Sequence, residues 1–283
     1  MPSILRLHAA RRDDIGDLST RRPLPGAGLP QLDPFLFLNH HGPQVYPLNN
    51  GGLPFGPHPH RGFETVTFIL DGELAHSDSG GHESVIGAGG VQWMTAGSGL
   101  VHAELSPESF KRAGGPLEIL QLWLNLPGRL KMVAPAYVGV QGDAVPEVPV
   151  GSGARMRLVS GEVDGVRGAI ASRTDAMLAT VAIDAGGEAL LHLPAGRQPF
   201  FYTVRGEVTL NGAGVPAWTL AELDRDGGTL RVGSDEGALL LFGHAQVIGE
   251  PVVSYGPFVM NTQAEIRQAI ADYQAGRMNG AAG

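Results

Sequence analysis

Phe68-Ile69-Leu70-Asp71-Gly72-Glu73-Leu74 begins with three apolar residues, continues with an Asp-Gly turn signal and returns to an apolar residue after Glu73. The same pattern returns 134 residues later as Tyr202-Thr203-Val204-Arg205-Gly206-Glu207-Val208. Apolar runs of this length on either side of a glycine turn are typical of two β-strands joined by a tight connection. A repeat at this distance predicts two copies of one all-β domain.

Other short apolar or alternating runs between turn signals have strand length rather than helix length. They are Glu64–Leu70, Gly90–Met94, Leu117–Leu124, Ala179–Ile183, Phe200–Val204 and Ala238–Phe242. The chain contains 42 Gly and 21 Pro among 283 residues, which supplies the many turns that short strands need. The sequence therefore predicts two antiparallel β-sandwiches or β-barrels.

The length suits two domains, and Pro and Gly cluster over residues 141–153. We expect an N-terminal domain over 1–140, a linker over 141–153 and a C-terminal domain over 154–283. The last segment differs in pattern, because Thr262 and Glu265 have the spacing of a capping box. Ile266, Ile270 and Tyr273 follow at helical spacing, so the chain is expected to end in an amphipathic helix.

Composition excludes several classes of function. The formal charge is -8, which disfavours direct binding of nucleic acid but is compatible with a protein partner. The chain has no Cys, so disulfides and thiolate chemistry are excluded. The N-terminal residues contain no apolar h-region and no stretch is long enough to span a membrane. We expect a cytoplasmic protein with no membrane association, acting as a monomer.

Two motifs of the first half carry possible chemistry. His58-Pro59-His60 and His102-Ala103-Glu104 each hold two polar side chains two residues apart, which places both on one face of a strand. Facing strands would then offer three imidazoles and one carboxylate to a first-row divalent metal, iron in particular. The alternative is that these are structural histidines, with Pro59 marking an edge strand or a turn.

The second half has no equivalent set. A shift of 134 residues lays His58 on His192, but His60 falls on Pro194 and Glu64 on Gln198. His244 is the only other nearby candidate ligand in that half. We therefore expect a single metal site, in the N-terminal domain. His76 and His82 flank a Ser/Gly turn and are expected to face solvent, and Asp78 and Glu83 beside them are expected to be solvated.

The chain resembles the pirin family of the cupin superfamily. The resemblance is carried by Phe55-Gly56-Pro57-His58-Pro59-His60-Arg61-Gly62-Phe63-Glu64-Thr65-Val66 and by Val91-Gln92-Trp93-Met94-Thr95-Ala96-Gly97-Ser98-Gly99-Leu100-Val101-His102-Ala103-Glu104. Weaker matches lie at Leu32–Leu36, Leu120–Pro127 and Tyr255–Thr262. The resemblance spans nearly the whole chain. It implies two tandem cupin jelly-roll barrels with a metal, usually iron, in the first barrel only.

By this resemblance the metal ligands are His58, His60, His102 and Glu104, and the metal is expected to be Fe²⁺, with other first-row ions possible. In other cupins a Glu four residues after the second His is a ligand, and that position is Glu64 here. Glu64 shares strand parity with the two histidines, so it is either an alternative ligand or a residue that supports the ligands. The chain has Gly90 where pirins commonly have Asp, a change that affects a turn.

The resemblance also implies a function. Some pirins, especially bacterial ones, resemble quercetin 2,3-dioxygenases, in which a flavonol and O₂ react at the metal. Glu104 would act there as ligand and as catalytic base. Phe55, Trp93 and Met94 are candidates for the apolar wall of a pocket for an aromatic substrate. Two alternatives stay open: a non-catalytic metal-binding regulatory protein that acts through a protein partner, and an enzyme for another enolised substrate.

Overall fold

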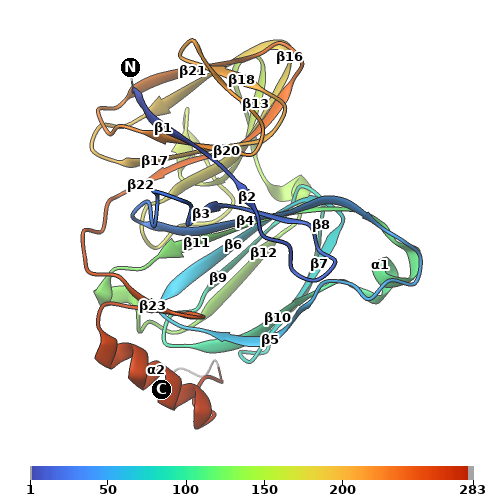
Figure 1. Ribbon diagram of the computed structural model, residues 1–283, viewed down its shortest axis with the longest axis vertical. Helices are drawn as coiled ribbons and strands as arrows, with labels where there is room; N and C mark the ends of the chain where they lie inside the picture. Colours follow the sequence, from blue (N-terminus) through green and yellow to red (C-terminus); the bar gives the residue numbers. More distant parts are fainter. Residues whose placement is uncertain (1, 280–283) are drawn as a thin grey trace. The chain divides into compact units, whose positions relative to one another are not determined.

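A computed structural model describes residues 2–279 as two compact units, each built from segments that are separated in the sequence (Figure 1). The early unit contains residues 12–21, 35–142 and 248–279, and the late unit contains residues 2–11, 22–34 and 143–247. Strands β2 (Arg11–Arg12) and β3 (Thr20–Leu24) carry the chain from one unit into the other. Both units are dominated by antiparallel strands, as the short apolar runs predict.

The early unit has two β-sheets that face each other. Five of its strands form one sheet in the order β12 (Ala136–Val140), β9 (Val91–Thr95), β6 (Phe63–Asp71), β11 (Gly115–Asn125) and β4 (Phe35–Tyr46). The second sheet has the order β5 (Phe55–His60), β10 (Leu100–Leu105), β7 (Glu73–Asp78) and β8 (Glu83–Gly87). Short helices α1 (Glu108–Ala113), η1 (Gly128–Leu130) and η2 (Gly142–Ala144) lie in the connections.

The late unit has one sheet that curls around its own core. Its order is β1 (Ile4–Ala9), β20 (Thr219–Leu223), β17 (Gln198–Arg205), β22 (Ala238–Ala245), β16 (Met177–Leu193), β21 (Gly228–Ser234), β18 (Val208–Leu210) and β19 (Ala213–Val215), with β13 (Glu147–Ser160) also on β16. The first half of β16 pairs with β22 and its second half with β21. A small hairpin of β14 (Glu162–Val163) and β15 (Val166–Arg167) completes the unit.

The two units repeat one strand arrangement. Strand β6 lies between β9 and β11, and β17 lies in the same way between β20 and β22. The turn after each central strand holds a glycine in the left-handed region, Gly72 with φ 84° and Gly206 with φ 76°. The repeated stretches at residues 68–74 and 202–208 thus form the same strand, turn and strand in both units.

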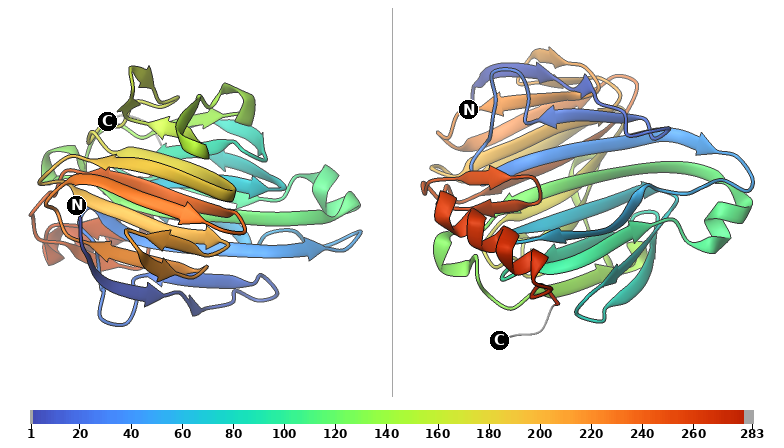
Figure 2. Two further views of the ribbon diagram at one scale, coloured as in Figure 1. Left: turned by 90° about the horizontal axis from the view of Figure 1, so that it is seen from above. Right: turned by 60° about the horizontal axis from the view of Figure 1, so that its bottom comes forward.

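The units differ from the expected division of the chain at both ends. The chain changes unit between Gly142 and Asp143, within the expected linker, but β1 belongs to the late unit because it pairs with the edge of β20. The C-terminal helix α2 (Gln263–Gln274) and the hairpin of β23 (Val253–Tyr255) and β24 (Phe258–Met260) belong to the early unit (Figure 2). Ile266, Ala269 and Met278 bury their side chains against that hairpin and Val101 of β10.

The capping box of α2 forms as expected. Thr262 accepts a hydrogen bond from the Glu265 amide, and the Glu265 carboxylate accepts one from the Asn261 amide. Neither α2 nor any other helix in residues 2–279 has the length and apolar character needed to cross a membrane.

Gly206 and Gly212 both have positive φ, at 76° and 91°, but only Gly206 is crowded. A Cβ at Gly206 would collide with the carbonyl oxygen of Gly237, whereas nothing lies within 4 Å of a Cβ at Gly212. Gly212→Ala should cost about 1 kcal/mol of unfolding free energy through backbone strain alone. Gly206→Ala should cost at least about 2 kcal/mol more because the β17–β18 turn must open. Urea denaturation measures both, and equal losses would contradict this account of the turn.

Candidate metal centre

Strand pairing brings three histidines of the early unit together. Antiparallel pairing of β5 with β10 puts His102 directly opposite His58, and Leu100 opposite His60. The three rings have centroid separations of 4.4 Å (His58–His102), 4.8 Å (His58–His60) and 4.9 Å (His60–His102). One nitrogen of each ring lies within 4.8 Å of one nitrogen of each of the others. In the described part of the chain, this is the one group of His, Cys, Asp or Glu with that geometry.

Hydrogen bonds orient two of the rings toward a common point. Nδ1 of His58 donates to the carbonyl of Gly56 at 2.8 Å, and Nδ1 of His60 donates to the carbonyl of Pro257 at 3.3 Å. In each ring the proton is then on Nδ1, and the lone pair of Nε2 remains available to a metal. This is the arrangement by which a backbone carbonyl usually fixes the tautomer of a ligand histidine.

His102 provides the test of whether the site fits a metal. Both of its ring nitrogens are buried and neither has a hydrogen-bond partner among the described residues. A buried polar group without a partner costs roughly 1–3 kcal/mol, so such groups usually mark a ligand or an ion. A divalent cation among His58, His60 and His102 would satisfy one of the two ring nitrogens of His102, and the donor set suits a first-row ion.

Burial keeps the imidazoles of His60 and His102 neutral. Desolvation, together with the charge of His58, lowers the pKa of His60 to about 3. Desolvation also lowers the pKa of His102 well below its usual range, with neighbouring histidines adding to the effect. Neutral imidazoles carry the lone pairs that coordinate metals, so His60 and His102 need not lose a proton at neutral pH before binding an ion.

Glu104 faces the same interior but lies apart from the three-histidine group. The register of β10 on β5 shifts between His102 and Glu104, and this bulge places Glu104 opposite Phe55. The carboxylate reaches the facing sheet, where it accepts hydrogen bonds from the hydroxyl of Thr67 at 3.0 Å and the amide of Gln121 at 2.5 Å. Burial raises the pKa of Glu104, while His58 and these two donors act in the opposite direction.

Glu64 lies on the other face of its strand. Strand β6 pairs regularly with β9 over residues 64–68, so Glu64 points away from the side that Thr67 presents to Glu104. Its carboxylate accepts a hydrogen bond from Thr95 at 2.6 Å. The expectation that Glu64 shares a strand face with His58 and His60 is not met, because these residues are not on one strand. Strand β5 ends at His60, and β6 begins only at Phe63. This placement argues against Glu64 as an alternative ligand.

The three residues expected to form a substrate wall occupy different environments. Phe55 is half-buried and stands over His41, with ring centroids 5.2 Å apart. Met94 is buried with Ala96, Leu100 and Tyr137. Trp93 is buried on the opposite face of β9 from Met94, away from the histidines. Of the three, Phe55 alone combines partial exposure with a place near the candidate metal ligands.

Other aromatic rings line the interior beside His60. Phe63 and Trp123 have centroids 5.0 Å and 5.3 Å from the His60 ring, and Phe37 stacks on Trp123 at 4.7 Å. Trp123 and Phe37 remain partly exposed, as does Gln121 beside them. Indole Nε1 of Trp123 donates to the side-chain oxygen of Gln121, which leaves the Gln121 amide to donate to Glu104. In the sequence, Trp123 lies in a pirin-like stretch, but the apolar pattern there does not separate a residue that lines a site from one that packs in the core.

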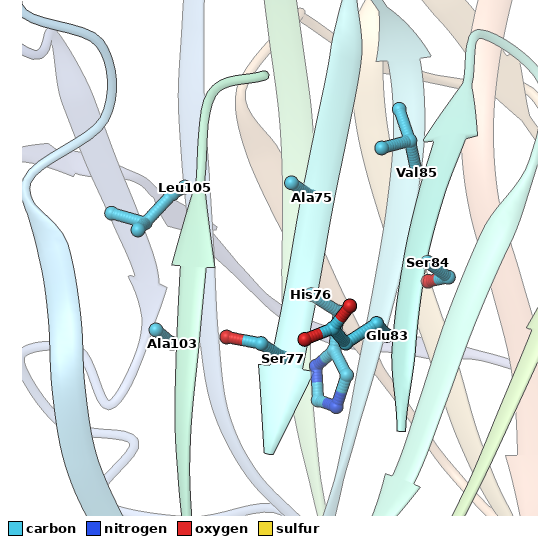
Figure 3. A pocket seen from close by; sticks show the side chains of 8 residues that line it. All are labelled: Ala75, His76, Ser77, Glu83, Ser84, Val85, Ala103 and Leu105. Carbon is cyan, nitrogen blue, oxygen red and sulfur yellow. The ribbon is translucent and has the colours of Figure 1, made fainter. Parts of the chain in front are cut away.

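His76 and Asp78 also face the interior, contrary to the expectation of solvated side chains. His76 is 3% exposed, stacks on Tyr137 at 3.9 Å and shares a hydrogen bond with Asp78. Both residues lie on β7, which pairs with β10, so they share a face with His102 and Glu104. The small side chains that alternate with these residues face outward, where Ala75, Ser77 and Ala103 line a shallow hollow (Figure 3).

The C-terminal segment supports the centre from outside the sheet. Pro257, which accepts from His60, precedes β24, and Arg61 forms an isolated β-bridge with Phe258. The Arg61 guanidinium also bonds the carbonyl of Ser98 and pairs with Asp272 of α2 at 2.7 Å. Hydrogen bonds from Arg61 and Arg277 lower the pKa of Asp272 to about 2. Helix α2 thus holds Arg61 in place, directly after the candidate ligand His60.

Comparison with known proteins agrees with this architecture. The pattern of the family "Pirin" matches residues 17–124, and that of the "Pirin C-terminal cupin domain" matches residues 178–279. The chain belongs to the pirin family. The expected pair of cupin domains with a C-terminal helix is confirmed.

Several pirin relatives cover most of the chain. A Pseudomonas aeruginosa protein named "Putative quercetin 2,3-dioxygenase" is 38% identical over 87% of this chain and 86% of its own. Mouse pirin is 36% identical over 90% of this chain and 86% of its own. The crystal structure of quercetin 2,3-dioxygenase from Acinetobacter baumannii has a TM-score of 0.92 at 32% identity and covers 98% of both chains.

Asp272→Asn should loosen α2. Removing the charge that pairs with Arg61 should speed amide exchange in α2 and β24 by about five- to tenfold, which corresponds to about 1 kcal/mol. Because the folded-state pKa of Asp272 lies below the usual 3.8, its stabilisation is present above pH 3.8 and is lost as the pH falls toward about 2. The variant should lack this acid dependence. Gln274→Ala, at the exposed end of α2, is the control, and equal exchange in both variants would refute the role of the ion pair.

Proposed function

We propose that this pirin is a metal-dependent dioxygenase that opens the heterocyclic ring of flavonols such as quercetin with O₂. His58, His60, His102 and Glu104 would hold one divalent ion, which we expect to be Fe²⁺. The observation that carries the proposal is the unpartnered, buried imidazole of His102, beside two imidazoles whose tautomers leave Nε2 free. The quercetin 2,3-dioxygenase names of a structural neighbour and of relatives support the reaction class.

Such an ion, when bound, supplies a Lewis acid with positions left open for substrate. Glu104 would take the proton of the flavonol 3-hydroxyl. Its burial raises the pKa toward the range in which a carboxylate can accept a proton at neutral pH. Thr67 and Gln121 each hold one carboxylate oxygen, so the group is fixed in orientation. A proton acceptor held in this way costs little reorganisation during the reaction.

The aromatic side chains give the site a preference for a flat substrate. Phe63 and Trp123 are 4.4 Å apart, and Phe37 extends the same surface. Trp123 and Phe37 are partly exposed, and such rings stack on planar ligands and exclude water from the reacting atoms. Phe55 stands at the start of β5, in the facing sheet, and would bound the substrate on another side.

Quercetin turnover tests the proposal. Protein loaded with Fe²⁺ without oxygen, then mixed with quercetin in air, should consume the flavonol and release one carbon monoxide per quercetin lost. Glu104→Gln, which keeps the shape of the side chain and its contact with Thr67, should lower the rate by at least about 100-fold. Absorbance and carbon monoxide are followed together, and His82→Gln, on the exposed turn after β7, is the control.

The result that overturns the proposal is complete iron loading without flavonol consumption. A non-catalytic role through a protein partner would then account for the site. Consumption of quercetin at the same rate by Glu104→Gln would refute the assignment of Glu104 as the base, although the reaction class would stand.

A further inference from the structure

The late unit contains a cavity of about 460 Å³. Its inner wall is formed by core side chains, namely Val150, Met156, Met177, Leu191 and Phe242. His244 contributes a partly buried imidazole, and the exposed side chains of His192, Glu162 and Asp164 line the rim. The volume is in the range of small-molecule sites, which are also mostly apolar with a few polar groups.

The cavity corresponds in position to the part of the early unit where Trp123 and Phe37 line the proposed substrate site. In that unit, Trp123 pairs with Thr65 on one side and Phe37 on the other. In the late unit, His244 pairs with Pro199 and Met177 in the same way, and 199 lies 134 residues after 65. His244 thus replaces Trp123, and Phe242 replaces Gln121.

The late unit has apolar side chains where the early unit has metal ligands. Its interior positions on β16 and β21 are Leu191, Leu193, Leu230 and Val232, all buried. His192 alternates with the two leucines, pairs with Thr229 and is exposed, so it does not take the place of His58 inside the barrel. No second group of ligands for a metal is found in residues 2–279. The late unit therefore has a cavity at this position but, among its described residues, no group to bind a metal ion beside it.

His244 is held in one protonation state by Arg197. Nε of Arg197 donates to Nδ1 of His244 at 2.7 Å, and the same guanidinium bonds the carboxylate and carbonyl of Asp175. Because Nδ1 accepts, the ring proton must be on Nε2. Burial and the Arg197 charge lower the pKa of His244 to about 4, so the ring is neutral at physiological pH. The cavity wall therefore carries a fixed, uncharged N–H donor.

The rim disfavours anions. Glu162 and Asp164 place carboxylates at the cavity mouth, although Glu162 is partly balanced by Arg167 at 3.2 Å. A carboxylate ligand would meet these groups, and Arg197 is already engaged by Asp175. A neutral ligand with one hydrogen-bond acceptor avoids this repulsion and satisfies the donor of His244.

We propose that the late unit is a second, metal-free binding site for a small, uncharged, largely apolar ring compound whose carbonyl oxygen accepts a hydrogen bond from Nε2 of His244. Met156 and Met177 contact the body of the ligand. The site is independent of the metal and of flavonol turnover.

Methyl NMR of the full-length protein tests this site, because two of its seven methionines line the cavity. Protein labelled with ¹³C at the methionine methyl groups is titrated with coumarin, a neutral bicyclic carbonyl compound, and with 2H-chromene, which lacks the carbonyl. Coumarin should shift the signals of Met156 and Met177 and leave that of Met94 in place. It should bind about five- to tenfold more tightly than 2H-chromene, as expected for one neutral hydrogen bond.

Two variants separate the donor from the cavity. His244→Phe should remove the preference for coumarin over 2H-chromene, whereas His244→Gln, whose amide can both accept from Arg197 and donate, should restore much of it. If His244→Phe does not fold, the ratio of the two affinities in the unmodified protein and in His244→Gln decides the matter. Unchanged Met156 and Met177 signals, or equal affinities for the two compounds in the unmodified protein, would overturn the proposal.

Discussion

The pairing register of β5 and β10 is the constraint on which the candidate metal centre depends. With His102 opposite His58, and Leu100 opposite His60, the three imidazoles fall on one face of the sheet. A slip by one residue would turn His102 toward the other face and separate it from the other two. The buried face that the two strands share fixes this register, since Leu100 and His102 on β10 and His60 on β5 are almost fully buried.

The same constraint explains why the C-terminal segment returns to the early unit. Strand β5 lies at the edge of its four-stranded sheet, and an edge strand is less firmly held than a central one. Pro257 and Asp272 hold His60 and Arg61 at the end of this strand, while Met278 packs over Gly99. A helix far along the sequence thereby stabilises candidate ligands that lie near residue 60.

The sequence predicts much of this arrangement because short-range patterns determine it. The two-residue spacing in His58-Pro59-His60 places both rings on one face, and the repeat at residues 202–208 predicts a second barrel. Long-range features are not visible in this way. The bulge before Glu104, the break in parity before Glu64 and the interior position of His76 follow from strand pairing. The exchange of β1 and α2 between units depends on tertiary packing, which leaves little local signal.

The central claim is that His102 completes a metal centre with His58, His60 and Glu104. X-ray absorption at the iron edge of the Fe²⁺-loaded protein tests it most directly, because imidazole rings give a characteristic multiple-scattering pattern. The account predicts about three imidazoles and one carboxylate per iron, and loss of one imidazole in His102→Gln. An unchanged spectrum in that variant, or iron bound mainly by oxygen ligands, would contradict it.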